Sequence, residues 1–122
     1  MDRMRLLIVD DDLDMLRSLA LMLSFEGYKV VTASSGPEAA SLLTEHKFDV
    51  VITDLRMSII DGYEIVRRTQ NLHPEASIIV TSSYIDEDAR AWMKDKGVTG
   101  LEKPYNVHQI SAMLRDFQMQ QV

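Results

Sequence analysis

The sequence predicts an α/β domain built around a doubly wound, five-stranded parallel sheet. Short runs rich in Val, Ile and Leu alternate with amphipathic stretches of about ten to twelve residues, and this pairing recurs along the whole chain. Most of the runs are unbroken rather than alternating, as strands buried on both faces require. The expected architecture is a three-layer sandwich with strand order 2-1-3-4-5, in which the first strand lies beside the third.

Five strands are predicted, at residues 5–9, 29–33, 49–53, 77–81 and 100–102. The first helix is predicted over residues 14–25, because Leu16, Leu19 and Leu23 form one apolar stripe. Gly27 follows this helix in a position that favours a left-handed C-cap.

Capping signals mark the other helices. The second begins at Ser35, because Ser35 and Glu38 have the spacing of a capping box and Pro37 stands at the first helical position. The second helix extends to about Glu45. Gly97 marks the end of the fourth helix. The last three helices are predicted at residues 62–71, 86–96 and 106–120, the last capped by Asn106.

Length, charge and composition limit the function classes. The 122 residues fit a single domain over residues 1–122, and the net charge of −6 argues against direct nucleic-acid binding. The chain has no cysteine, which excludes disulfides, thiolate nucleophiles and cysteine-ligated metals. No run approaches the roughly 18 apolar residues of a membrane span, so we expect a cytoplasmic protein without membrane contact.

Acidic side chains follow two strands that are neighbours in the predicted order. Asp10, Asp11 and Asp12 come directly after the first strand, and Asp54 comes after the third. Because ligands of parallel α/β sheets bind outside the carboxyl ends of the strands, at least three carboxylates are expected to converge there. Their mutual repulsion requires a compensating cation, and oxygen-only ligation favours Mg²⁺ over Ca²⁺.

Two further strand ends complete this predicted site. The fourth strand ends at the hydroxyls of Thr81, Ser82 and Ser83, and the fifth ends at Lys103. Acid, hydroxyl and ammonium groups would then meet at one edge of the sheet, a combination typical of sites that handle anions. Asp12 and Asp14 are instead interpreted as caps or first-turn acids of the first helix, where the helix dipole favours negative charge.

Four motifs along the chain make it resemble the receiver domains of two-component response regulators. They are Leu7-Ile8-Val9-Asp10-Asp11-Asp12, Asp54-Leu55-Arg56-Met57 with Asp61-Gly62, Ser82-Ser83, and Lys103-Pro104. The resemblance covers about residues 5–117 and includes the chemotaxis regulators. It implies the flavodoxin-like (βα)₅ fold that the strand pattern already predicts.

The resemblance implies a role for each site residue. Asp54 would be the phosphoacceptor, Asp10 and Asp11 would hold Mg²⁺ together with Asp54, and the backbone carbonyl of Arg56 would complete the protein ligands. Ser82 would be the switch hydroxyl. Lys103 would bind the phosphoryl group, with a cis peptide before Pro104.

The implied function is a phosphorylation switch rather than a turnover enzyme. A sensor histidine kinase or histidine phosphotransfer protein would donate the phosphoryl group. The change would be transmitted to the surface formed by residues 86–96, 100–102 and 106–120, where an output partner or effector domain binds. A phosphorylation-dependent homodimer is a further expectation from the resemblance.

The sequence also departs from the family pattern and leaves alternatives open. Gly100 or Leu101 stands where a switching aromatic is usual, and neither Tyr84 nor Tyr105 is assigned that role. Trp92 fits an interface anchor and simple packing equally well. Three other functions compete with the switch: an aspartyl-nucleophile phosphatase, a flavin module that the acidic first loop disfavours, and a degenerate receiver that only binds partners.

Overall fold

The structure, a computed structural model, describes residues 3–120. Strands and helices alternate as β1 (Arg5–Val9), α1 (Leu13–Phe25), β2 (Lys29–Ala33), α2 (Gly36–Glu45), β3 (Val50–Asp54), α3 (Gly62–Leu72), β4 (Ser77–Ser82), α4 (Glu87–Lys96), β5 (Thr99–Glu102) and α5 (Val107–Gln120). All strand pairs are parallel and the sheet order is β2-β1-β3-β4-β5. The predicted fold class and strand order are therefore confirmed.

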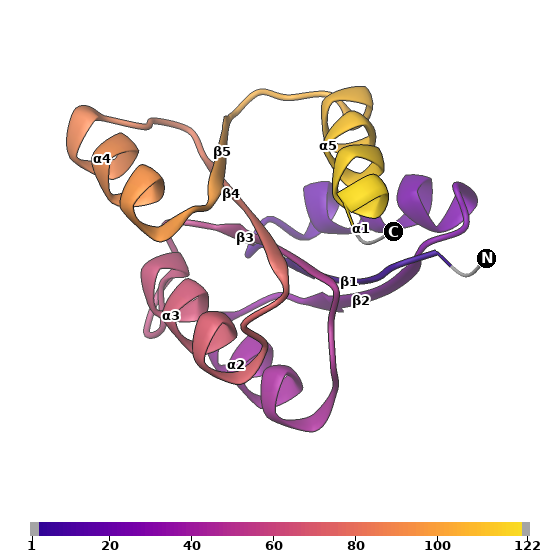
Figure 1. Cartoon of the computed structure of the whole chain (residues 1–122), viewed down its shortest axis with the longest axis horizontal. Coiled ribbons are helices and arrows are strands. Elements are labelled where there is room, and N and C mark those ends of the chain that lie inside the picture. The colour runs from indigo at the N-terminus through magenta and orange to yellow at the C-terminus, as the bar shows by residue number, and fades with distance from the viewer. Residues whose placement is uncertain (1–2, 121–122) are drawn as a thin grey trace.

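The sheet lies between two helical layers. Helices α1 and α5 cover one face, whereas α2, α3 and α4 cover the other (Figure 1). Successive side chains of β1 point to opposite faces of the sheet, so the core has two halves. Leu6 and Ile8 pack with α1 and α5 on one face. Leu7 and Val9 pack with α2 on the other face. Within residues 3–120, no helix is long and apolar enough to cross a membrane.

Four predicted strand boundaries differ from the structure by one residue, and the first of these is the start of β3 at Val50 rather than at residue 49. Asp54 closes β3 because it pairs with Thr81, and Ser82 closes β4 because it pairs with Glu102. The fifth strand begins at Thr99 rather than at residue 100. As a result, Asp54 and Ser82 are the last residues of their strands rather than the first residues of loops.

The helix caps agree with the sequence. The side chains of Asp12, Ser35 and Asp86 each accept a hydrogen bond from the backbone N–H three residues further on. Because Asp86 is the cap, α4 begins at Glu87, one residue later than predicted. Gly97 closes α4 in the left-handed conformation, with φ of 71°.

Gly62 allows α3 to start against the end of β3. A Cβ atom at this position would lie 2.3 Å from the carbonyl oxygen of Asp54 and 2.6 Å from the Cα atom of Leu55. Only glycine permits so close an approach of two backbones. The Gly62 N–H donates to the carbonyl of Leu55 at 2.9 Å, so the first residue of α3 is bonded to the residue that follows Asp54.

Candidate functional site

The acidic residues of the site come from the ends of adjacent strands. Val9 and Thr53 are register partners in β1 and β3, and the acidic residues follow each of them directly. One carboxylate oxygen each from Asp10, Asp11 and Asp54 lies within 4.8 Å of the other two. The predicted convergence of three carboxylates is therefore present.

The three carboxylates differ in exposure. Asp10 and Asp54 are buried, with 3% and 7% of their surface exposed, whereas Asp11 faces solvent. One oxygen of the Asp10 side chain is held by the backbone, because its Oδ1 accepts a hydrogen bond from the N–H of Asp12 at 2.9 Å. The side chain of Asp12 caps α1 and is not part of the cluster, as predicted.

Lys103 brings the compensating positive charge. Its Nζ lies 3.1 Å from Oδ2 of Asp10 and 3.4 Å from Oδ2 of Asp54. The peptide bond between Lys103 and Pro104 is cis, as the resemblance implied. The Lys103 backbone N–H donates to the carbonyl of Ser82 at 2.7 Å, which joins the segment after β5 to the end of β4.

The electrostatics of the pocket favour neutralisation of Asp54. Burial raises the pKa of Asp54, the nearby Asp10 adds to the rise, and the Lys103 charge only partly opposes it. Burial by itself lowers the pKa of Lys103, but the hydrogen bond and charge of Asp10, followed by the charge of Asp54, raise it overall. An ammonium group is thus held between carboxylates whose negative charge exceeds its own.

Ser82 is buried and hydrogen-bonded away from the carboxylates. Its hydroxyl donates to the carbonyl of Tyr84 at 3.1 Å. The Arg56 guanidinium donates to the same carbonyl at 3.4 Å, so the β4–α4 loop is held by two donors. Release of the serine hydroxyl would leave this carbonyl with its arginine partner.

Two residues at or just after the end of β5 were not singled out by the sequence for the contacts they make. Glu102 accepts the N–H of Ile85 at 3.2 Å, which fastens the start of α4 to β5. Tyr105 lies close enough to the site that burial, followed by the charge of Asp10, raises the pKa of its phenol. The sequence did not predict these contacts, because neither a glutamate in a short strand nor a tyrosine after a proline indicates by itself which groups it will meet.

Side chains of α4 and of the loop before it fill the space beside Gly100, one of the two positions where a switch aromatic is usual in the family. A Cβ atom added at Gly100 would lie 2.5 Å from the sulfur of Met93 and 3.5 Å from Cδ1 of Ile85. Both side chains are buried. Met93 and Ile85 therefore occupy the space above Gly100, whereas Tyr84 is exposed.

The carboxylate cluster fits a hard divalent cation. Three carboxylate oxygens in one small volume suit Mg²⁺, which is commonly bound through a few carboxylates and water. A depression of ≈ 430 Å³ lined by Asp11, Arg56 and Ser58 opens beside the cluster. The ligand role of the Arg56 carbonyl stays a prediction.

Comparison with known proteins agrees with this geometry. Residues 6–115 match the family model described as "Response regulator receiver domain". The transcriptional regulatory protein GlrR of Escherichia coli is 43% identical over 79 residues, which are 65% of this chain and 18% of GlrR. A response regulator receiver protein of Anaeromyxobacter is 35% identical over 107 residues, 87% of this chain and 45% of that protein.

A solved structure resembles the whole fold. The response regulator protein TrrA of Thermotoga maritima, solved in complex with Mg²⁺-BeF, matches with a TM-score of 0.81 and 26% identity, covering 96% of this chain and 99% of TrrA. The chain spans less than half the length of the two curated relatives.

Proposed function

The chain belongs to the response regulator receiver domain family, and on this premise we propose that Asp54 is its phosphoacceptor. The observation that carries the proposal is the Lys103 ammonium, which lies between Asp10 and Asp54 beside the three-carboxylate cluster. The general function of the family is a phosphorylation switch in two-component signalling. The proposal assigns that chemistry to particular atoms of this chain.

The proposed reaction is transfer of a phosphoryl group from a phosphohistidine. An oxygen of the Asp54 carboxylate forms the new P–O bond while the P–N bond breaks, and the electron pair of that bond stays on the imidazole nitrogen of the donor. Lys103 stabilises the charge on the phosphoryl oxygens. The contacts of its Nζ with Asp10 and Asp54 support this role, because the phosphoryl charge would develop beside the same carboxylates.

We further propose that Asp10, Asp11 and Asp54 hold Mg²⁺. When bound, the ion would neutralise part of the negative charge shared by the carboxylates and the phosphoryl oxygens. Asp11 is the exposed member of the set, so it offers a ligand on the solvent side. Asp10 is fixed on the inner side by the Asp12 N–H and by Lys103.

The switch is proposed to begin at Ser82. A phosphoryl group on Asp54 offers new acceptor oxygens, and the serine hydroxyl would exchange its bond to the Tyr84 carbonyl for a bond to one of them. The β4–α4 loop would shift with it. Because Glu102 ties Ile85 to β5, this movement would reach the surface of α4, β5 and α5.

A sensor histidine kinase or phosphotransfer protein would supply the phosphoryl group, and an output partner or effector would contact α4, β5 and α5. Residues 1–122 are proposed to act as one receiver domain that binds no nucleic acid directly and does not turn over substrate. Homodimerisation on phosphorylation and a cytoplasmic location stay predictions.

Intact mass spectrometry after incubation with acetyl phosphate tests the proposal. We expect one phosphoryl group on the wild-type chain in the presence of Mg²⁺, and none on Asp54→Asn. Asp12→Asn is the matched control, because it changes an adjacent acid that caps α1 and should keep full labelling. Absence of both an adduct and a stable beryllofluoride complex would contradict the proposal.

Steady release of phosphate separates the switch from the phosphatase alternative. A switch is modified once per chain, whereas an enzyme at catalytic concentration would hydrolyse many equivalents of a phosphomonoester. We expect no such turnover with p-nitrophenyl phosphate. Turnover that survives Asp54→Asn would favour a different nucleophile.

A further inference from the structure

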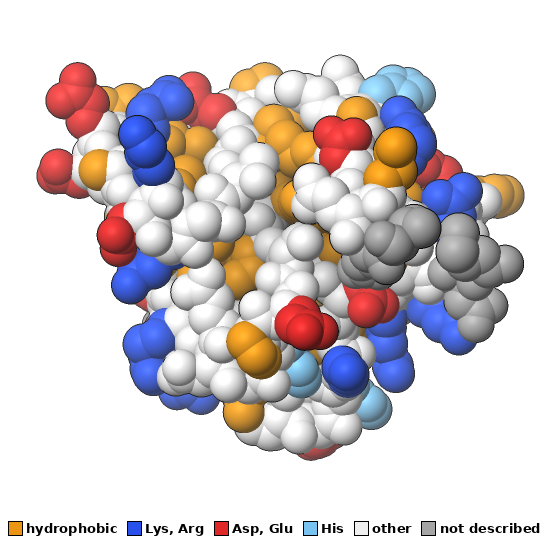
Figure 2. Space-filling model, in the orientation of Figure 1, with side chains coloured by type: hydrophobic (Ala, Val, Ile, Leu, Met, Phe, Trp, Pro, Cys, Tyr) orange, Lys and Arg blue, Asp and Glu red, His pale blue; other side chains and the backbone are white. Residues whose placement is uncertain are grey.

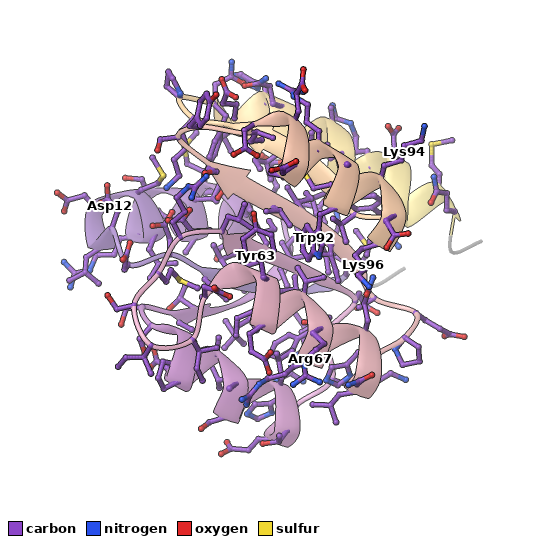
Figure 3. The ribbon with its side chains drawn as sticks, turned by 90° about the vertical axis from the view of Figure 1, so that its left-hand side faces the viewer. Asp12, Tyr63, Arg67, Trp92, Lys94 and Lys96 are labelled. Atoms are coloured by element: carbon purple, nitrogen blue, oxygen red, sulfur yellow. The ribbon has the colours of Figure 1, made fainter. Side chains whose placement is uncertain are left out.

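A groove between α3 and α4 lies apart from the carboxylate cluster. It has a volume of ≈ 790 Å³ and is lined from α3 by Tyr63, Arg67 and Arg68 and from α4 by Trp92 and Lys96. Figure 3 shows Tyr63 and Trp92 directed toward one another between the two helices. None of the residues proposed to bind the phosphoryl group or Mg²⁺ lines this groove.

The floor of the groove is aromatic. Tyr63 and Trp92 meet edge to face with ring centroids 4.6 Å apart, and both are only partly buried. At one end the apolar surface continues onto Ile59 and Ile60, of which Ile59 is 91% exposed.

Trp92 and Met93 have different surroundings, although they are adjacent in α4. Met93 is buried over Gly100 of β5, whereas Trp92 contacts Tyr63 of α3 and lines the groove. The output surface expected for the family involves α4 together with β5 and α5. The groove is therefore a second surface, on the α3 side of α4.

The charge of the groove is opposite to that of the chain. Glu64 is bound by both Arg67 and Arg68, whose hydrogen bonds lower its pKa to about 2. Two guanidinium groups share this one carboxylate. Lys96 adds a third cation at the far end and pairs at 3.8 Å with the exposed Asp95, which does not line the groove. With Asp61 included, the lining carries a net charge of about +1, on a chain whose net charge is −6.

The groove is formed without a partner. The side-chain amide of Gln70 donates to the carbonyl of Lys96 at 2.8 Å, which ties the carboxyl ends of α3 and α4 together. In the space-filling view, Lys and Arg side chains lie along the α3 edge of the molecule and several acidic side chains lie over α4 (Figure 2). A partner with acidic groups would therefore be directed toward α3 and the end of α4.

We propose that this groove docks an acidic peptide segment of a partner protein. An apolar or aromatic side chain of the segment packs on Tyr63 and Trp92, and its carboxylates face Arg67 and Lys96. A nucleic acid is a poorer occupant, because its repeating phosphates would meet Asp61 and Glu64 in the groove and the negative field of the chain. The proposal does not depend on phosphorylation of Asp54.

Selection from a random peptide display library tests which chemistry the groove prefers. We expect the selected peptides to combine Asp or Glu with Phe, Leu or Trp, and to be lost when selection uses Lys96→Glu. A synthetic copy of the leading peptide is then titrated into the chain. Trp92 is the only tryptophan, so its fluorescence reports binding at the groove itself.

Lys94→Glu is the matched control, because Lys94 lies on the same helix, is exposed and does not line the groove (Figure 3). Lys96→Glu should weaken binding by about tenfold, whereas Lys94→Glu should change it by less than about twofold. Raising NaCl from 50 to 300 mM should weaken binding several-fold. Thermal unfolding of both variants verifies that they are folded.

Three results would overturn the proposal: no groove-dependent peptide, selected peptides without an excess of acidic residues, or equal effects of the two lysine variants. The same titration on Asp54→Asn separates this inference from the proposed function. Binding to that variant is expected to be unchanged. If Asp54 were not phosphorylated, the peptide-binding result would still stand. If no peptide bound the groove, the phosphorylation result would still stand.

Discussion

The ammonium group of Lys103 contacts Asp10 at 3.1 Å and Asp54 at 3.4 Å, although neither β1 nor β3 is adjacent to β5 in the sheet. The long lysine side chain reaches past β4 to meet both carboxylates. One cation thus faces two buried acids, and the pocket keeps an excess of negative charge.

Removing the ammonium should raise the pKa of Asp54 further. In Lys103→Met the burial of Asp54 and the charge of Asp10 remain, while the largest opposing influence is lost. Carboxyl carbon NMR over a pH titration measures the change. Lys94→Met, which removes an exposed lysine far from the cluster, should leave the Asp54 titration where it is, and an unchanged pKa in Lys103→Met would contradict the assignment.

Asp54→Asn should stabilise the metal-free chain at neutral pH. The folded pKa of Asp54 lies above its unfolded value near 3.8, so its favourable contribution is complete below that value and is lost as pH rises through the folded pKa. At pH 7 the substitution should raise the free energy of unfolding by about 1 kcal/mol. In urea titrations this gain should shrink toward pH 4.

Asp95→Asn serves as the control for that experiment, because Asp95 is exposed on α4. It removes the same charge from the chain at an exposed position rather than at a buried one. A gain of equal size in Asp95→Asn would attribute the effect to net charge rather than to the pocket. A lower stability of Asp54→Asn at pH 7 would argue against the burial account.

Mg²⁺ should stabilise the wild-type chain through the carboxylate cluster. A ligand that binds only the folded state adds about 2.7 kcal/mol at a hundred times its dissociation constant, and a smaller but measurable amount at a concentration near that constant, where the site is half occupied. Thermal unfolding with and without 10 mM MgCl₂ should show the increase in Tm. Asp11→Asn should abolish it, whereas Asp12→Asn, which preserves the cap of α1, should retain it.

Ser82→Ala should separate modification from response. Beryllofluoride should still bind, because the carboxylates and Lys103 are unchanged, but the amide shifts of residues 83–86 and of α4 should change much less than in the wild type. Ser83→Ala is the control, since Ser83 is exposed next to the buried Ser82. Equal shift changes in Ser82→Ala and wild type would remove the hydroxyl from the switch.

The same substitution at two glycines should have unequal effects on stability. In Gly62→Ala the new methyl group meets the backbone of Asp54 and Leu55, which cannot move without shifting the site. In Gly100→Ala it meets the flexible end of Met93. We expect a loss of about 2–3 kcal/mol for the first and less than about 1 kcal/mol for the second, measured by urea unfolding.

Reduced beryllofluoride binding should accompany the loss in Gly62→Ala, because the displaced backbone carries the phosphoacceptor. Gly100→Ala should bind normally. Similar costs for the two variants would show that the contact of Gly62 with the end of β3 relaxes more easily than the structure indicates.

Local signals in the sequence were enough for the fold and for most of the site. Unbroken Val, Ile and Leu runs require burial on both faces, and caps such as Asp12, Ser35 and Gly97 act within one helical turn of their own position. The acidic residues could be placed because carboxyl ends of parallel strands share one edge of a sheet. The ends of β3 and β4 lie one residue later than predicted. Asp54 and Ser82 belong to these strands because they pair with Thr81 and Glu102, and the sequence near each of them does not indicate that pairing.

Local sequence signals therefore established the order of the elements, the edge of the sheet that carries the acids, and the identity of the residues there. The contacts between side chains that are far apart in the sequence became visible only in the folded chain. Asp10 and Lys103 are 93 positions apart, Tyr63 and Trp92 come from different helices, and Met93 fills the space above Gly100 only because α4 packs on β5 at that level. Such contacts depend on register and helix packing, which are set by all neighbouring elements together and leave no periodic trace along the chain.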